Sequence, residues 1–176
     1  GSGCSIISLA SLGHTYSGIH GAVGVDVSLD ALEVAQNNKD INNVPYVELI
    51  QSDMFEALEG SGMKFDVIVS NPPYIPTRVI KGLDEEVRLH DPFIALDGDE
   101  DGLKFYRIIT DKARDYLNKD GYLCYEIGHD QAAKVSDILS SYGYNDIRVI
   151  KDLAGLDRVV VARYYGTSVR SGSYNI

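Results

Sequence analysis

Phe65-Asp66-Val67-Ile68-Val69-Ser70 is followed directly in the sequence by Asn71-Pro72-Pro73-Tyr74. A short apolar run that ends at turn-forming residues predicts a buried strand feeding a loop. Each proline holds its own φ at about −65° and biases the residue before it toward an extended conformation. We therefore expect a stiff loop, residues 71–74, whose polar groups keep a fixed direction at the end of this strand.

The 71–74 loop carries hydrogen-bond acceptors that suit an amino group. Asn71 has a side-chain carbonyl, and Pro72 and Pro73 have no N–H to compete for the neighbouring backbone carbonyls. Two such acceptors can hold both hydrogens of one NH2 group, and Tyr74 adds a flat apolar face. The lone pair of that planar nitrogen would then point at an electrophilic methyl group, so the loop predicts methyl transfer to nitrogen. The alternative is that the proline pair forms only a turn.

The rest of the chain has the pattern of an α/β domain. Short β-branched runs alternate with segments of helical period, which is typical of a doubly wound, mostly parallel sheet. We expect helices over residues 4–12 (ending at Gly13), 29–43, 103–117 and 130–142, and strands over residues 22–27, 46–51, 65–70, 122–127, 146–151 and 158–164. A turn containing Gly155 joins the last two strands, which predicts an antiparallel closing pair. One domain is expected over residues 1–165, followed by a disordered tail or expression remnant over residues 166–176.

The chain of 176 residues is acidic, with 26 aspartates and glutamates against 16 lysines and arginines and a formal net charge of −10. This balance argues against a basic surface that would bind nucleic acid, so a protein is the expected partner. No stretch approaches the roughly 20 apolar residues of a membrane span, and no signal-peptide pattern opens the chain. We expect a cytoplasmic protein that contacts neither a membrane nor, directly, nucleic acid.

The cysteines and histidines show no metal-ligand pattern. Cys4 and Cys124 lie in apolar runs without C-x-x-C spacing, so we expect two buried thiols in a reducing compartment. The histidines lack paired spacing and are expected at the surface or in packing roles. They are His14, His20, His90 and His129. The sequence therefore predicts no metal site.

Three further groups have positions that suit a nucleotide-like ligand. Gly1-Ser2-Gly3 stands before the first helix, where a glycine loop lets backbone N–H groups approach a ligand. Asp26 ends the next strand, where a carboxylate can accept hydrogen bonds from a ribose diol. Asp53 and Met54 follow the strand after that and offer polar and apolar contacts for adenine. Each group has a plainer alternative. The glycines could be a cloning remnant, Asp26 an acid near a helix N-cap, and Asp53 an acid in a turn.

The carboxyl ends of parallel strands share one edge of a sheet, so we expect these groups and the 71–74 loop to meet there. In this order they resemble the HemK/PrmC family, the release-factor glutamine methyltransferases, which are class I S-adenosylmethionine-dependent methyltransferases with a Rossmann-like fold. The resemblance covers nearly all of residues 1–164. It is carried by Gly1-Ser2-Gly3-Cys4, Ile7-Ser8-Leu9-Ala10, Val25-Asp26-Val27-Ser28, Ser52-Asp53-Met54-Phe55, Ser70-Asn71-Pro72-Pro73-Tyr74-Ile75-Pro76, Glu86, Asp91-Pro92, Ala95-Leu96-Asp97-Gly98, Asp101-Gly102-Leu103, Tyr106-Arg107, Glu126-Ile127-Gly128 and Gln131.

The resemblance implies a reaction and roles for these residues. A methyl group would pass from S-adenosylmethionine, leaving S-adenosylhomocysteine, to the side-chain amide of the glutamine in the Gly-Gly-Gln motif of peptide chain release factors. Gly1 and Gly3 would face the methionine part of the donor, Asp26 its ribose and Met54 its adenine. Asn71 and Pro72 would bind the substrate amide, and Tyr74 would pack against it. The implied site comprises Gly1, Gly3, Asp26, Asp53, Met54 and Asn71 for the cofactor, Asn71, Pro72, Pro73 and Tyr74 for the substrate, and Asn71, Pro72 and Tyr74 for catalysis.

The chain also departs from the family pattern. The family has a strand ending in an acid just before the position of Gly1, preceded by a helical substrate-binding domain. We therefore expect a fragment holding the catalytic domain, with the first strand of its sheet absent. Residues 12–22 have no functional explanation, and the acidic stretches 84–86 and 97–101 are expected to form a solvated loop over the site.

Two other functions stay open at this point. One is an enzyme that methylates amino groups of adenine or cytosine in nucleic acid, which would need a basic channel. The other is a non-catalytic adaptor that keeps the methyltransferase fold. We expect a monomer, while the preferred release factor and the need for a partner subunit are open.

Overall fold

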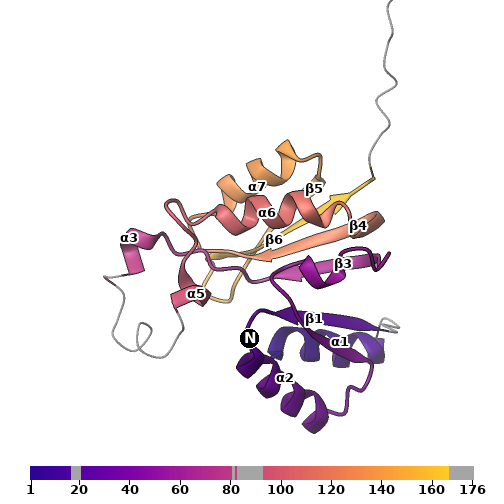
Figure 1. Ribbon diagram of the computed structural model, residues 1–176. Helices are drawn as coiled ribbons and strands as arrows, with labels where there is room; N and C mark the ends of the chain where they lie inside the picture. Colours follow the sequence, from indigo (N-terminus) through magenta and orange to yellow (C-terminus); the bar gives the residue numbers. More distant parts are fainter. Residues whose placement is uncertain (17–20, 81, 83–92, 167–176) are drawn as a thin grey trace, which may run out of the picture. The chain divides into compact units, whose positions relative to one another are not determined.

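The computed structural model of this chain describes residues 1–16, 21–80, 82 and 93–166 (Figure 1). The chain divides into two compact units, Gly1–Gly62 and Met63–Ile176. Several features expected from the sequence lie outside the described residues. They are residues 17–20 of the 12–22 stretch, which include His20, the acidic stretch 84–86, His90, Asp91-Pro92 and residues 167–176 of the tail.

The unit Gly1–Gly62 combines a pair of parallel strands with two helices. The strands are β1 (Ala22–Asp26) and β2 (Val47–Gln51), and the helices are α1 (Cys4–Tyr16) and α2 (Leu29–Ile41). A 3-10 turn, η1 (Glu56–Leu58), follows β2. In the register of the two strands, Asp26 lies opposite Gln51. Both strands therefore end at the same edge of their sheet.

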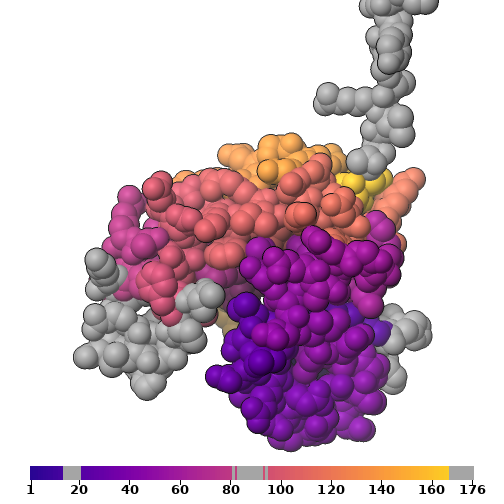
Figure 2. Space-filling model, in the orientation of Figure 1, coloured from indigo at the N-terminus to yellow at the C-terminus, as the bar shows by residue number. Residues whose placement is uncertain are grey.

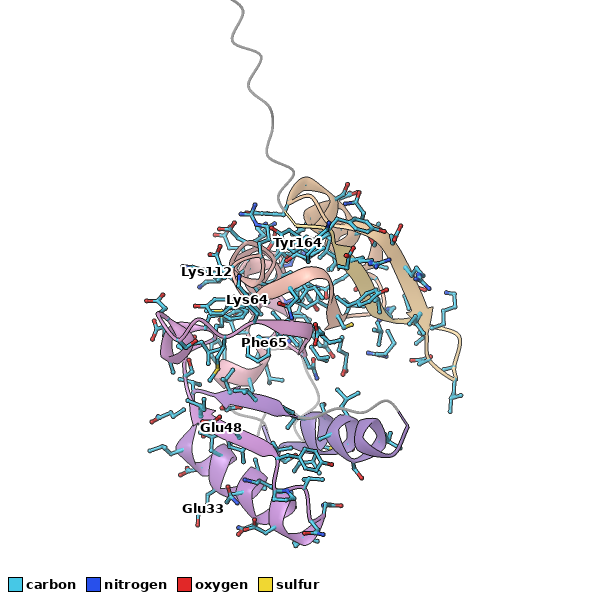
Figure 3. The ribbon with its side chains drawn as sticks, turned by 90° about the vertical axis from the view of Figure 1, so that its right-hand side faces the viewer. Glu33, Glu48, Lys64, Phe65, Lys112 and Tyr164 are labelled. Atoms are coloured by element: carbon cyan, nitrogen blue, oxygen red, sulfur yellow. The ribbon has the colours of Figure 1, made fainter. Side chains whose placement is uncertain are left out.

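The local sequence explains where α2 begins and which face it buries. Ser28 has an extended backbone, and its Oγ accepts a hydrogen bond from the Ala31 N–H (3.2 Å), which caps the helix. Ala35 is only 1% exposed, whereas Glu33 is exposed on the outward face (Figure 3). The helix therefore turns one face to the apolar core of the unit and the other to solvent.

A small apolar core holds this unit together. Its buried members are Ile7, Ala10, Val44 and Val47, against which Ile6, Ala22, Tyr46 and Leu49 pack. Helix α1 continues past Gly13, so the expected end at that glycine is wrong. Gly13 is buried one turn beyond Ala10, and a glycine inside a helical pattern is tolerated where it faces the packed side.

The unit Met63–Ile176 is built on a four-stranded sheet in the order β3-β4-β6-β5. The strands are β3 (Phe65–Ser70), β4 (Leu117–Glu126), β5 (Asn145–Lys151) and β6 (Asp157–Tyr164). β3 is parallel to β4, and β6 is antiparallel to both β4 and β5. Gly155 has φ +81° in the turn between β5 and β6. The expected α/β class, with parallel strands and an antiparallel closing strand, is confirmed.

Helices α6 (Lys104–Ala113) and α7 (Ala132–Ser141) cover one face of this sheet (Figure 1). Tyr106 of α6 and Tyr125 of β4 are fully buried and meet edge to face, with ring centroids 5.1 Å apart. The Tyr125 hydroxyl lies 2.9 Å from Thr110 Oγ1, so the polar groups of this core are hydrogen-bonded to each other. Between β3 and α6 in the sequence, the structure has two short helices, α3 (Thr77–Ile80) and α5 (Phe93–Leu96).

The expected helix over residues 103–117 is too long at its carboxyl end. α6 stops at Ala113, and Leu117 instead begins β4, where it is buried and pairs with Phe65. The Phe65 N–H donates to the Tyr116 carbonyl (2.8 Å). Pairing with β3 therefore outweighs the helical spacing of the apolar residues in this stretch.

The cysteines differ in their surroundings. Cys4 is exposed at the first position of α1, so the expectation of a buried thiol is wrong there. An apolar run on a helix turns some of its members toward solvent, and Cys4 is one of these. Cys124 of β4 is half-buried, and burial raises the pKa of its thiol. Within the described residues, no helix has the length and apolar character to cross a membrane.

Candidate active site

The glycine loop at the start of the chain is shaped by close contact between two helices. Gly3 has φ +74°, and a Cβ on it would lie 2.9 Å from the Ala35 Cβ and 3.1 Å from the Ile7 Cδ1. Both the backbone conformation and the lack of space therefore favour glycine. Gly1, in contrast, has open space around its Cα. Only one of the two glycines predicted to bind the cofactor is thus required by packing.

Asp26 lies at the end of β1, next to this loop. Its Oδ1 accepts a hydrogen bond from the Ser28 N–H (2.8 Å), and its Oδ2 forms an ion pair with the amino group of Gly1. Asn38 of α2 donates to the Ser2 carbonyl (2.9 Å). These contacts place the glycine loop and the carboxylate of Asp26 side by side.

Ser52 fixes the turn that follows β2, although sequence reasoning suggested no role for it. It is 6% exposed, and its N–H donates to the Asp26 carbonyl (2.9 Å). Its Oγ donates to the Met54 carbonyl (3.1 Å) and accepts from the Ala57 N–H (2.9 Å). Met54 has φ +48°, which is uncommon for a residue with a side chain. Asp53 and Met54 are therefore held at the edge of the sheet where Asp26 lies.

This edge of the β1-β2 sheet offers three kinds of contact. The glycine loop allows close approach to backbone, Asp26 supplies acceptor oxygens, and the half-buried Met54 supplies apolar surface. A ligand that combines a diol with a planar base needs these three contacts. The candidate cofactor residues in this unit are Gly1, Gly3, Asp26, Asp53 and Met54.

In the other unit, the 71–74 loop follows β3 directly. Pro72 is buried, and Pro73 and Tyr74 are half-buried, so the backbone of the loop is anchored. Asn71 is exposed, and no described residue makes a hydrogen bond to its side chain. The loop therefore presents an available amide from a fixed backbone.

The chain after α5 runs alongside the chain that leaves the 71–74 loop. A parallel bridge joins Ile75 to Asp97, and the Gly98 N–H donates to the Ile75 carbonyl (2.9 Å). Thr77 Oγ1 donates to Asp97 Oδ1 (2.6 Å). The expectation that residues 97–101 form a solvated loop therefore needs correction, because this stretch is bonded to the chain beside it.

Two glycines allow the closest part of this contact. A Cβ on Gly98 would lie 2.7 Å from the Gly102 Cα and 3.0 Å from the Pro73 carbonyl oxygen. Gly102 has φ +73°, and a Cβ on it would overlap the Tyr74 carbonyl oxygen. Main chain thus packs directly on main chain. We call residues 97–102 the brace.

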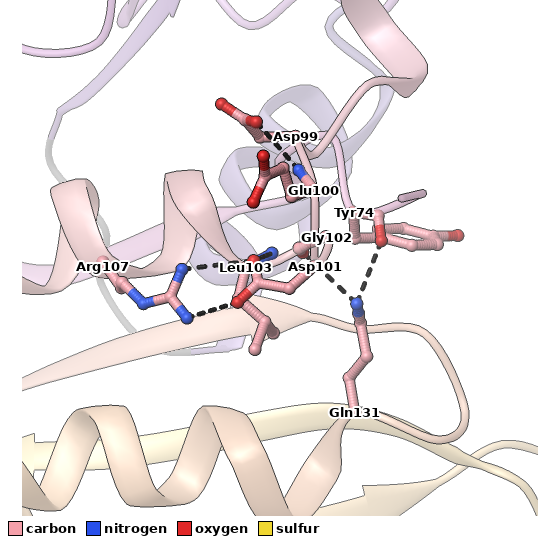
Figure 4. Close-up of polar contacts among 8 residues, drawn as sticks. All are labelled: Tyr74, Asp99, Glu100, Asp101, Gly102, Leu103, Arg107 and Gln131. Carbon is pink, nitrogen blue, oxygen red and sulfur yellow. Dashed lines mark hydrogen bonds and ion pairs between the residues drawn. The ribbon is translucent and has the colours of Figure 1, made fainter. Parts of the chain in front are cut away.

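Gln131, just before α7, forms hydrogen bonds to both the 71–74 loop and the brace (Figure 4). Its carboxamide is buried, with 6% of the residue exposed. Nε2 donates to the carbonyls of Tyr74 (3.0 Å) and Gly102 (3.3 Å), and Oε1 accepts from the Gly128 N–H (3.0 Å). Sequence reasoning included Gln131 among the residues that carry the family resemblance but suggested no role for it.

Two exposed ion pairs join carboxylates of the brace to the side chains of α6. Arg107 binds both carboxylate oxygens of Asp101, at 3.2 and 2.5 Å (Figure 4). The hydrogen bond from Arg107 lowers the pKa of Asp101. Lys104 lies 3.0 Å from Asp99, and its hydrogen bond lowers the pKa of that carboxyl as well. The salmon-coloured part of the chain that includes α6 lies on the face viewed in Figure 2. The side chains of both pairs are about half exposed.

The site residues expected from the sequence fall into two groups. Gly1, Gly3, Asp26, Asp53 and Met54 belong to one unit, and Asn71, Pro72, Pro73 and Tyr74 belong to the other. The expectation that all lie on one sheet edge is corrected, because the described strands form two sheets, with β1 and β3 each at the end of its own. Among the described residues, no group of three or more His, Cys, Asp or Glu side chains could hold a metal ion.

The architecture is shared with methyltransferases of known structure. A methyltransferase from Pyrococcus furiosus is similar with a TM-score of 0.63 and 21% sequence identity, over 91% of this chain and 70% of that one. A likeness at this identity concerns the fold. The arrangement of strands and helices, with ligand-type residues following β1, β2 and β3, is that of a Rossmann-like class I methyltransferase domain.

Sequence similarity assigns the chain to particular families within the class I methyltransferases. Residues 1–95, more than half of the chain, match the model of the methyltransferase small domain family. The release factor glutamine methyltransferase of Agrobacterium fabrum is 46% identical over 142 residues, which are 80% of this chain and 48% of that protein. The one from Geobacter sulfurreducens is 43% identical over 164 residues, 93% of this chain and 55% of that protein. The chain belongs to the methyltransferase small domain family and to the HemK/PrmC family. It spans about half the length of these curated relatives.

Proposed function

We propose that this chain carries the catalytic residues of an S-adenosylmethionine-dependent methyltransferase. Its substrate would be the side-chain amide nitrogen of the glutamine in the Gly-Gly-Gln motif of peptide chain release factors. The relatives named release factor glutamine methyltransferase support the assignment. The observation that carries it is the 71–74 loop, where the exposed Asn71 amide stands next to the buried Pro72.

In this proposal the loop binds the substrate amide through its acceptors. The side-chain carbonyl of Asn71 and the backbone carbonyl next to Pro72 would each accept one hydrogen of the glutamine NH2 group. The nitrogen lone pair is then directed away from the loop, and the half-buried Tyr74 limits sliding of the amide plane. No strong base is needed before the methyl group arrives, since the proton can leave the nitrogen afterwards.

The donor would be held by the unit Gly1–Gly62. The residues fit such a ligand, because the Ser28 N–H orients the carboxylate of Asp26 and the half-buried Met54 offers apolar surface at the same sheet edge. S-adenosylmethionine, when bound, supplies the methyl group. Gly1 and Gly3 would face its methionine part, and Asp26 would accept from its ribose hydroxyls. Asp53 and Met54 would contact the adenine.

The partner in this proposal is a release factor, and the chemistry requires neither a membrane nor direct contact with nucleic acid. The net charge of −10 fits a protein substrate better than a polyanion. Translation termination takes place in the cytoplasm, where we place the protein, and we propose that it acts as a monomer.

The test is methyl transfer from isotopically labelled S-adenosylmethionine. Purified protein is incubated with a release factor and with a variant of that factor in which alanine replaces the glutamine of Gly-Gly-Gln. We expect label only in the first. Calorimetric titration with S-adenosylhomocysteine should show binding, and its absence would favour a non-catalytic adaptor. Label in adenine or cytosine of an oligonucleotide, with none in the release factor, would overturn the proposal in favour of a nucleic-acid enzyme.

A further inference from the structure

Gln131 stands at the start of α7, but its side chain forms hydrogen bonds to loops outside that helix. It stands immediately before α7, yet its side chain makes no hydrogen bond to the first turn of that helix. Its backbone already has partners, since its N–H donates to the Gly128 carbonyl (2.9 Å) and its carbonyl accepts from the Val135 N–H (3.0 Å). The carboxamide therefore does not cap α7, and it bonds to Tyr74, Gly102 and Gly128 instead.

The direction of the carboxamide follows from its neighbours. Two carbonyl oxygens, those of Tyr74 and Gly102, need donors, and one N–H, that of Gly128, needs an acceptor. Only the orientation with Nε2 toward the carbonyls satisfies all three. The Tyr106 hydroxyl lies 3.5 Å from Oε1 and donates to the Glu126 carbonyl at 2.9 Å. Within the described residues, no buried side-chain nitrogen or oxygen lacks a hydrogen-bond partner.

One side chain thus ties together three segments that are distant in the sequence. Tyr74 closes the 71–74 loop after β3, Gly102 ends the brace, and Gly128 follows β4. Because Pro72 and Pro73 restrict the backbone between them, fixing the Tyr74 carbonyl also limits how Asn71 can turn. A displacement of about 1 Å at a positioning group can lower a rate about 100-fold.

We propose that Gln131 is a positioning residue for methyl transfer. Its two Nε2 hydrogens hold the Tyr74 and Gly102 carbonyls together, and this contact keeps the acceptors of Asn71 and Pro72 directed at one point. Gln131 itself does not touch the substrate. The proposal rests on the proposed function, because it assigns Gln131 to the loop that would bind the substrate amide.

Gln131→Glu tests this assignment with the smallest change in shape. The introduced carboxyl keeps an acceptor for the Gly128 N–H but has lost the NH2 group that serves Tyr74 and Gly102. We expect kcat to fall about 100-fold. The affinity for S-adenosylhomocysteine, bound by the other unit, should stay within about twofold. As pH is lowered the carboxyl gains a proton and can donate one hydrogen bond, so the ratio of wild-type to variant kcat should shrink.

Tyr144→Phe is the matched control. It removes a buried hydroxyl that donates to the Thr110 carbonyl (3.1 Å), far along the chain from the 71–74 loop. The two variants should lose similar folding stability, but only Gln131→Glu should lose kcat. If Gln131→Glu does not fold, Gln131→Met, which has similar length and no charge, carries the same expectation. Equal kcat losses in the Gln131 and Tyr144 variants, or a kcat within about threefold of wild type in a folded Gln131 variant, would overturn the proposal.

Hydrogen exchange separates this inference from the proposed function. The Ile75 N–H donates to the Leu96 carbonyl (3.0 Å), next to the Tyr74 contact. Its exchange should become faster in Gln131→Glu and stay unchanged in Tyr144→Phe, whatever reaction the protein performs. A wild-type protein that methylates no release factor overturns the proposed function and with it the expected effect of Gln131 on kcat. Unchanged exchange at Ile75 overturns the positioning role alone.

Discussion

A side chain on Gly102 would occupy the place of the Tyr74 carbonyl oxygen, so these two residues touch through main chain alone (Figure 4). Gly102 also has a left-handed backbone at φ +73°. The contact therefore depends on glycine for both shape and conformation. It lies where the brace meets the 71–74 loop, which makes it a sensitive point for a mutation.

Gly102→Ala should destabilise the fold and move the loop. The backbone conformation alone costs about 1–2 kcal/mol with a Cβ, and the overlap with Tyr74 adds about 1–3 kcal/mol. Gly155→Ala is the control, because Gly155 has φ +81° but no atom within 4 Å of the added Cβ. Urea unfolding gives the loss in free energy of unfolding for each variant, and the difference between the two losses is the cost of the overlap with Tyr74. Equal losses would show that Tyr74 and Gly102 are not in contact in solution.

Gly3→Ala should weaken cofactor binding as well as stability. The added Cβ would lie 2.9 Å from the Ala35 Cβ, which forces the glycine loop away from α2. We expect the dissociation constant for S-adenosylhomocysteine to rise about tenfold, equivalent to about 1.4 kcal/mol. Gly60→Ala, at φ +73° with open space, changes the same unit without this contact and should leave the affinity unchanged. Calorimetric titration measures both variants.

Asn71→Ala should abolish most turnover while the protein stays folded. Asn71 is exposed, so its removal should change the free energy of unfolding by less than about 0.5 kcal/mol. Loss of one acceptor for the substrate amide should lower kcat about 100-fold. Asn37→Ala, at an exposed position on α2, is the matched control. Full turnover in Asn71→Ala would remove the loop from the mechanism.

Acid should loosen the ion pair next to the brace. Because Arg107 lowers the pKa of Asp101, the pair stabilises the folded state above the ordinary carboxyl pKa of about 3.9. This contribution is lost as pH falls through the lowered value. Carboxyl NMR should show Asp101 titrating below its usual range in the wild type. Arg107→Met should move that titration upward, and an unchanged curve would contradict the pairing.

Alkali should unfold the unit Met63–Ile176. Burial raises the pKa of Tyr106, Tyr125 and Tyr144, so the folded state keeps their hydroxyls protonated. Their stabilising contribution is complete below the unfolded tyrosine pKa of about 10 and decreases as pH rises above it. Tyrosinate absorbance should rise in step with loss of circular dichroism. Tyr144→Phe should lessen this dependence on pH.

The sequence predicts most of the strands, but not that the candidate residues divide between two sheets. β3 begins and ends where its apolar run does, but the expectation of a buried strand is wrong, since Val67 and Val69 are exposed and β3 is the end strand of its sheet. The predicted end of α1 at Gly13 was wrong, and so was the prediction that Leu117 belongs to a helix. Packing and strand pairing override the local spacing of apolar residues in both places. The role of Gln131 could not be predicted, since its contact to Tyr74 joins residues 57 positions apart.

The close contact between Gly98 and Gly102 limits which sequence changes this domain can accept during evolution. The distance between the two chain segments is set there by backbone atoms, with no side chain interposed. Exchanges among the outward residues nearby, such as Glu100 and Lys104, leave that distance unaltered. Descendant sequences can therefore acquire new recognition surfaces around an inherited contact between main-chain segments.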